Sequence, residues 1–129
     1  MSKKIVIVGA LGYLGTELCK LYSGESWFNK VIAIDNRFVS ERVNQLINWN
    51  IEFYQQEILD KDFLKKILTD ADIVHHLAGI TDVAYIKNES SRELDNKIKK
   101  IAIEGTNNIL ETISSKCKII FPSTHVIFE

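Results

Sequence analysis

The sequence has little proline and cysteine, and it has no long apolar run. Its 129 residues include one proline and two cysteines, and 16 basic against 17 acidic side chains give a net charge of −1. With so little proline to mark a linker, we expect a single domain over residues 1–129. The balanced, interspersed charges favour neither a nucleic-acid partner nor a membrane surface. No segment approaches the roughly 20 apolar residues of a membrane-spanning helix.

The cysteines and histidines do not have the spacing of a metal site. Cys19 falls on an expected helix and Cys117 just before an expected strand. We therefore expect two buried thiols, which are typical of a reducing, cytoplasmic compartment. His75 and His76 are adjacent on an expected strand, so their side chains should point to opposite faces and share no ion. Because a strand is expected almost at the first residue, the sequence predicts no signal peptide.

What the chain does have is an apolar strand that runs into regularly spaced glycines. Residues 4–9 read Lys-Ile-Val-Ile-Val-Gly, and glycine recurs at positions 12 and 15 before a helical pattern. We expect Gly9 to allow a tight turn and Gly12 to let a pyrophosphate approach the backbone. Gly15 should let the helix lie close to the sheet. The helix N-terminus would then offer N–H groups and partial positive charge to phosphates.

An acidic residue strengthens this interpretation, because the glycine spacing alone is a weak signal. The second expected strand ends in Asp35, twenty positions after Gly15. At this distance a carboxylate can accept hydrogen bonds from both adenosine ribose hydroxyls and repel a 2′-phosphate, which predicts NAD in preference to NADP. Arg37 weakens that preference. The alternative is a simple helix–sheet turn with packing glycines and an aspartate that starts a loop.

Apolar periodicity predicts alternating strands and helices along the chain. We expect strands at 4–9, 30–35, 51–55, 72–77 and 118–121, and helices at 13–22, 40–47, 60–68 and 92–114. Ser40 and Asp60 are the expected N-caps of the second and third helices. Right-handed crossovers then give an α/β fold with a doubly wound, Rossmann-type parallel sheet of order 3-2-1-4-5, truncated after strand five. The ligand crevice should lie between strands one and four.

Further motifs accompany the glycines. They are Asp35-Asn36, Glu57-Ile58, His76-Leu77-Ala78-Gly79, the segment 104–111 with Gly105-Thr106, and the segment 121–128 with Ser123-Thr124. With these motifs the whole chain resembles the first half of the extended short-chain dehydrogenases/reductases, the NAD-dependent epimerase/dehydratase group that acts on nucleotide sugars. The resemblance implies NAD as cofactor and, for the full-length relative, a nucleotide-sugar substrate.

The resemblance also implies roles for individual residues. The implied cofactor-binding residues are Gly9, Leu11, Gly12, Tyr13, Leu14, Gly15, Asp35, Asn36, Glu57, Ile58, Leu77, Ala78 and Gly79. Among them, Glu57 and Ile58 would hold the adenine. Thr124 takes the place of the family's catalytic serine or threonine, although it also fits a plain strand-end hydroxyl.

Some positions depart from the family pattern. Ala102 replaces an asparagine, and the catalytic Tyr-x-x-x-Lys pair is absent. The residues four positions after the four tyrosines are Glu17, Ser26, Ile58 and Glu89. A tyrosine acts as the base only when a neighbouring lysine lowers its pKa from about 10, and a threonine hydroxyl cannot replace it.

We therefore expect a chain that binds a dinucleotide but does not catalyse turnover alone, because the substrate half and the Tyr-x-x-x-Lys region are absent. A non-catalytic NAD(P)-binding sensor or interaction protein of the same fold is the alternative. The strand at 118–121 is expected to leave an unpaired edge, which favours a homodimer.

Overall fold

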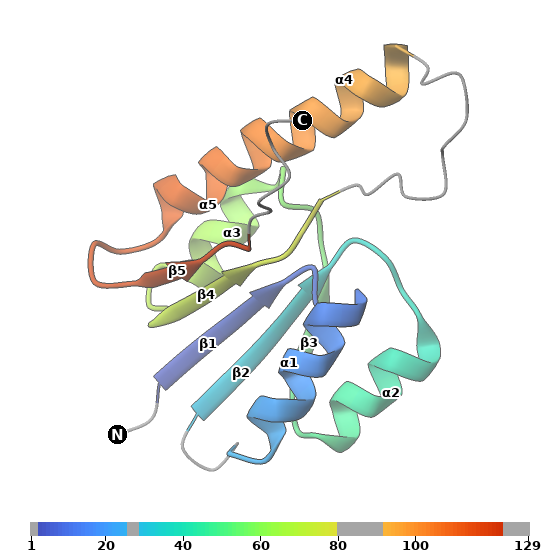
Figure 1. The fold of residues 1–129 in the computed structure, drawn as a ribbon. Coiled ribbons are helices and arrows are strands. Elements are labelled where there is room, and N and C mark those ends of the chain that lie inside the picture. The colour runs from blue at the N-terminus through green and yellow to red at the C-terminus, as the bar shows by residue number, and fades with distance from the viewer. Residues whose placement is uncertain (1–2, 26–28, 80–91, 123–129) are drawn as a thin grey trace.

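A parallel five-stranded sheet lies between two helical layers (Figure 1) in the computed structural model, which describes residues 3–25, 29–79 and 92–122. The strands are β1 (Lys3–Val8), β2 (Asn29–Asp35), β3 (Glu52–Gln55), β4 (Ile73–His76) and β5 (Lys118–Ile120). The helices are α1 (Tyr13–Ser23), α2 (Ser40–Asn48), α3 (Lys61–Leu68), α4 (Arg92–Lys100), η1 (Ile101–Gly105) and α5 (Thr106–Thr112). The sheet order β3-β2-β1-β4-β5 confirms the prediction.

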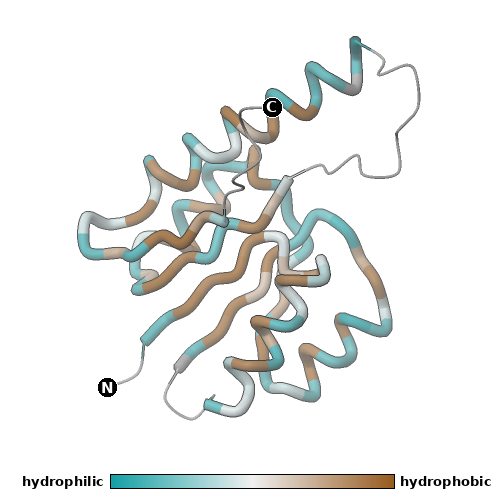
Figure 2. The backbone as a smooth tube through the Cα atoms, viewed as in Figure 1, coloured by the Kyte–Doolittle hydropathy of each residue, from teal (hydrophilic) through white to brown (hydrophobic). Residues whose placement is uncertain are grey.

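The central strand β1 is buried on both faces, as its unbroken apolar run predicts. Val6 is paired with Ile32 of β2 and with Val74 of β4, and all four residues from Ile5 to Val8 are at most 2% exposed. The strands carry the most apolar stretches of the tube, and the helices alternate apolar with hydrophilic positions (Figure 2). The sheet is therefore the apolar middle layer of the domain.

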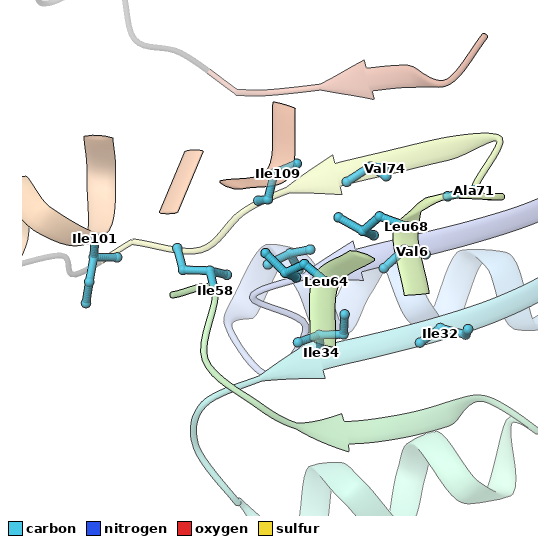
Figure 3. Packing of buried hydrophobic residues seen from close by; sticks show 11 residues of the cluster. Val6, Ile32, Ile34, Ile58, Leu64, Leu68, Ala71, Val74, Ile101 and Ile109 are labelled. Atoms are coloured by element: carbon cyan, nitrogen blue, oxygen red, sulfur yellow. The ribbon is translucent and has the colours of Figure 1, made fainter. Parts of the chain in front are cut away.

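Each face of the sheet has its own hydrophobic cluster. One cluster packs α3 and α5 on the sheet (Figure 3) and contains Val6, Val8, Ile32, Ile34, Ile58, Leu64, Leu68, Ala71, Val74, Ile101 and Ile109. The other packs α1 and α2 on the opposite face and contains Ile5, Ile7, Ala10, Leu11, Cys19, Val31, Ala33, Val43, Leu46 and Ile51. Successive strand residues point to opposite faces, so β1 contributes to both clusters.

One of the two predicted helix caps is correct. The carboxylate of Asp60 accepts from the N–H of Phe63 at 3.1 Å, as expected for an N-cap. The prediction for Ser40 is wrong, because the N-cap of α2 is Val39 and Ser40 is already helical. The helical ladder begins one residue earlier than expected, with the Val43 N–H donating to the Val39 carbonyl at 2.9 Å.

The helix predicted at 92–114 is interrupted by the π-helical segment η1 and ends at Thr112. A π turn adds a residue, which shifts the helical phase. Across this segment Ile101, Gly105 and Ile109 are buried, whereas Ala102 is exposed. Close packing accompanies the π turn, because a Cβ on Gly105 would lie 2.1 Å from Cδ1 of Ile58.

The two thiols differ in burial. Cys19 is fully buried, and burial raises the pKa of its thiol to about 12. The prediction of a buried thiol is wrong for Cys117, which is only partly buried because it lies in the turn that leads into β5. In residues 3–25, 29–79 and 92–122, none of the helices has the length and apolar character needed to span a membrane.

Candidate functional site

A cleft of about 780 Å³ lies at the carboxyl ends of the central strands, where the Rossmann-type topology predicts a ligand site. Its walls come from the glycine turn, the end of β2, the loop after β3, the end of β4, and helices α2, α4 and η1. The lining residues are Val8, Gly9, Gly12, Tyr13, Leu14, Gly15, Ile34, Asp35, Asn36, Arg37, Arg42, Gln56, Glu57, Ile58, Leu77, Ala78, Gly79, Lys97, Ile101 and Pro122.

Two glycines of the turn are required by space and backbone conformation. Gly9 has φ +83°, and a Cβ there would lie 2.7 Å from backbone atoms of Leu77 and Ala78. A Cβ on Gly15 would lie 2.5 Å from the carbonyl oxygen of Gly9, so α1 approaches the turn closely. At Gly12 a Cβ would meet only the Gly9 oxygen, at 3.5 Å. A side chain at position 12 would therefore not clash with the protein, and the glycine instead keeps the adjoining part of the cleft open.

The N-terminus of α1 faces this cleft without a side-chain cap. Its N-cap is Gly12, which has no side chain to accept a hydrogen bond. The first N–H groups of a helix have no partner within the helix, and here they belong to the cleft-lining residues Tyr13, Leu14 and Gly15. Uncapped N–H groups together with the helix dipole make this end of α1 suited to an anion such as a phosphate.

Asp35 lies beside the turn and is only 6% exposed. Its Oδ2 accepts from the Leu11 N–H at 2.9 Å, and its Oδ1 accepts from the Arg37 N–H at 3.0 Å and from Arg37 Nε at 3.3 Å. The sequence predicted a carboxylate aimed at a ribose. In the structure that carboxylate also holds the glycine turn, through Leu11.

The opposite wall of the cleft is built on Ile58 and Glu57. Ile58 is 6% exposed, and its carbonyl accepts from Asn108 Nδ2 of α5 at 3.0 Å. Glu57 is exposed at the cleft rim. The side chain of Asn108 therefore ties α5 to this wall.

His75 and His76 point to opposite faces of the sheet, as predicted. His75 Nε2 lies 2.7 Å from the hydroxyl of Tyr22 on α1, whereas His76 Nε2 lies 2.8 Å from the hydroxyl of Thr106 on α5. Burial lowers the pKa of both imidazoles below the usual value near 6.5. Neither histidine lines the cleft, and each connects the sheet to a helix through its Nε2.

Most of the residues expected to bind the cofactor line this cleft, together with eight residues that were not expected there. Twelve of the thirteen expected cofactor-binding residues line it, and the exception is Leu11, whose side chain is fully buried in the core. Lys97, on the lysine-rich end of α4, was not among the expected residues, but it lines the cleft. Arg42 was missed because no local pattern distinguishes it from other polar residues on its helix. Thr124 lies outside the described residues, as do the rest of segment 123–128 and residues 80–91.

The sheet order and the glycine turn after β1 define a domain of Rossmann type. Comparison with known proteins then identifies the family. The sequence model of the 3-beta hydroxysteroid dehydrogenase/isomerase family matches residues 6–129, and the chain belongs to this family. The expected relation to NAD-dependent epimerases and dehydratases is confirmed.

Curated proteins with similar sequences and a solved structure support this family assignment. The chain is 27% identical to UDP-N-acetyl-alpha-D-glucosaminuronate decarboxylase of Bacillus cytotoxicus, over 99% of this chain and 38% of that protein. It is 30% identical to dTDP-D-glucose 4,6-dehydratase of Dictyostelium discoideum, over 98% of this chain and 30% of that protein.

UDP-glucuronic acid 4-epimerase from Bacillus cereus, solved with UDP-glucuronic acid and NAD, matches with a TM-score of 0.80 and 27% identity. That match covers 98% of this chain and 41% of the epimerase. The chain therefore spans well under half the length of these relatives.

Proposed function

We propose that residues 1–129 form a single NAD-binding domain, the cofactor-binding part of a nucleotide-sugar epimerase or dehydratase. The observation that carries this proposal is that the uncapped N-terminus of α1 and the carboxylate of Asp35 line one cleft. An adenine dinucleotide carries a pyrophosphate and a ribose diol, and the cleft offers an anion site and a diol acceptor. The relative solved with NAD and UDP-glucuronic acid supports the same assignment.

In this proposal Asp35 favours NAD over NADP, because a carboxylate repels a 2′-phosphate. The positive charge of Arg37, two residues later, weakens this preference for NAD. A carboxylate accepts at about four lone-pair sites, and three described donors already contact Asp35. The Arg37 side chain is 56% exposed and can swing away. Ribose binding would thus exchange the contact with Arg37 Nε for a hydroxyl.

The proposed role of the chain is to hold the cofactor. Bound NAD would supply the hydride acceptor, and the glycine turn and Asp35 would orient it. The sequence has no tyrosine with a lysine four positions later, so we propose that residues 1–129 do not turn over a nucleotide sugar alone. Thr124 is proposed to hydrogen-bond a reacting sugar oxygen. The free thiols of Cys19 and Cys117 support the proposal of a reducing, cytoplasmic location.

Calorimetric titration with NAD and NADP tests this function. We expect NAD to bind with a Kd below about 1 mM and more tightly than NADP. Asp35→Asn should weaken NAD binding by about tenfold or more, since hydrogen bonds to a charged group contribute roughly 1.5–3 kcal/mol. Asp72→Asn is the matched control, because Asp72 also accepts from a backbone N–H, that of Lys4 at 2.7 Å, but lies at the other end of the sheet.

Three outcomes would count against the proposal. Failure of both dinucleotides to bind below about 1 mM would favour an interaction protein that keeps only the fold. Tighter binding of NADP would reverse the assigned preference. Turnover of a nucleotide sugar by the 129-residue chain would refute the absence of catalysis. If NAD binds without turnover, a non-catalytic sensor is separated from an enzyme part by whether the chain becomes active when the C-terminal part of a nucleotide-sugar epimerase is supplied.

We also propose a homodimer through the edge of β5. Within the described residues β5 pairs only with β4, and Ile120 and Phe121 next to this edge are 40% and 59% exposed. An unpaired apolar edge invites pairing with a second copy, and a lysine placed there opposes it. We expect a dimer by light scattering and a monomer for Ile120→Lys. A monomeric unsubstituted chain at high concentration would contradict the proposal.

A further inference from the structure

The peptide groups on either side of Leu11 form the part of the glycine turn that leads to the α1 N-terminus. The Leu11 N–H donates to Asp35, and the preceding carbonyl, of Ala10, accepts from the Thr16 hydroxyl at 3.2 Å. The Gly12 N–H donates to the Gly9 carbonyl at 3.3 Å. The remaining group is the Leu11 carbonyl, and it accepts from Nη1 of Arg42. Arg42 thus completes the set of contacts that holds these two peptides.

Arg42 reaches the turn from a separate element. It lies on α2, on the helical layer that also contains α1, and its guanidinium carbon is 5.3 Å from the centroid of the Tyr13 ring. Tyr13 is 87% exposed, so the ring covers the guanidinium from the solvent side and not from the core. A guanidinium that lies over a ring and is hydrogen-bonded to a carbonyl is restricted in orientation.

We propose that Arg42 is a positioning residue for the pyrophosphate of the dinucleotide, an inference that rests on the proposed function. It acts through Leu11. By holding the carbonyl of the peptide that leads into Gly12, Arg42 fixes the direction of the N–H groups that follow at Tyr13, Leu14 and Gly15. Those N–H groups bind an anion only when they converge on it, so a turn that rotates freely loses affinity for the pyrophosphate.

This role predicts a dependence on ligand chemistry. Ligands that contain the pyrophosphate, NAD and ADP-ribose, depend on the turn, whereas adenosine contacts only the adenine and ribose side. Removal of the Arg42 donor should therefore weaken the first two ligands and spare adenosine. A general loss of folding would weaken all three ligands together.

The experiment is titration of NAD, ADP-ribose and adenosine into the 129-residue chain. We expect Arg42→Met, which keeps the apolar stem, to weaken NAD and ADP-ribose about tenfold and adenosine less than about twofold. Arg42→Lys keeps a donor for the Leu11 carbonyl and should restore most of the affinity. Gln45→Met, an exposed position on the same helix, is the matched control and should match the unsubstituted chain.

The outcomes separate this inference from the proposed function. If the unsubstituted chain binds NAD and Arg42→Met binds it equally well, the role of Arg42 is wrong while the proposed function stands. An equal loss for adenosine and ADP-ribose would also overturn it, since that result indicates a general structural role. If the unsubstituted chain binds no dinucleotide, both proposals fail. If Arg42→Met does not fold, Arg42→Lys with the same three ligands decides the question, and equal loss of all three overturns the inference.

Discussion

Replacing Gly9 with alanine is expected to lower the free energy of unfolding by about 3 kcal/mol or more. The backbone at Gly9 has φ +83°, which costs roughly 1–2 kcal/mol for a residue with a Cβ. The added Cβ would also lie 2.7 Å from backbone atoms of Leu77 and Ala78, and overpacking against atoms that cannot move costs about 1–3 kcal/mol more. Urea unfolding without ligand measures the change.

Gly12→Ala is the matched control in the same turn. Its Cβ would meet only the Gly9 oxygen, at 3.5 Å, which is an ordinary contact. We expect its stability to stay within about 1 kcal/mol of the unsubstituted chain, while NAD binding weakens because the methyl group occupies the cleft. Equal stability of the Gly9→Ala and Gly12→Ala chains would show that the turn relaxes and that our account of Gly9 is incorrect.

Gly105→Ala is expected to destabilise the chain by about 2 kcal/mol through a single contact. A Cβ at Gly105 would lie 2.1 Å from Cδ1 and 2.7 Å from Cγ1 of Ile58, inside a region where both residues are buried. Ile58 lines the cleft, so its displacement should also weaken NAD binding. Urea unfolding and NAD titration of the same variant report the two effects.

A double-mutant cycle tests whether Ile58 is the cause. In an Ile58→Ala background the two clashing carbon atoms are absent, and the closest remaining contact of the new Cβ is 3.5 Å. Gly105→Ala should then cost less than about 0.5 kcal/mol, which gives a coupling energy of more than 1 kcal/mol. If Gly105→Ala costs the same in both backgrounds, the π turn and not Ile58 requires glycine.

The features that the sequence predicts well depend on neighbours along the chain. The apolar strand before Gly9, the glycine spacing and the acid at the end of β2 are local patterns, and topology rules then give the sheet order. Within the described residues, these local patterns and topology rules predict most of the residues that line the cleft. The N-cap of α3 is similar, because Asp60 and the N–H it accepts from are three positions apart.

The features that sequence reasoning missed depend on contacts between distant segments. The π turn in η1 accompanies packing of Gly105 against Ile58, which is 47 positions earlier in the chain. Arg42 contacts a carbonyl 31 positions away, and Lys97 lines the cleft from a helix whose charge pattern resembles a solvated face. Periodicity carries no information on such contacts, since each is decided by three-dimensional packing.

The separation of the hydrophobic core into two clusters has a mechanical consequence for the cleft. Leu11 belongs to the cluster under α1 and α2, whereas Ile58 and Ile101 belong to the cluster under α3 and α5. The two walls of the cleft are thus held by different hydrophobic clusters, which pack on opposite faces of the same sheet. A molecule that contacts both walls would therefore connect the two hydrophobic clusters to each other. Ligand binding should therefore stiffen the domain as a whole and raise the cooperativity of its unfolding.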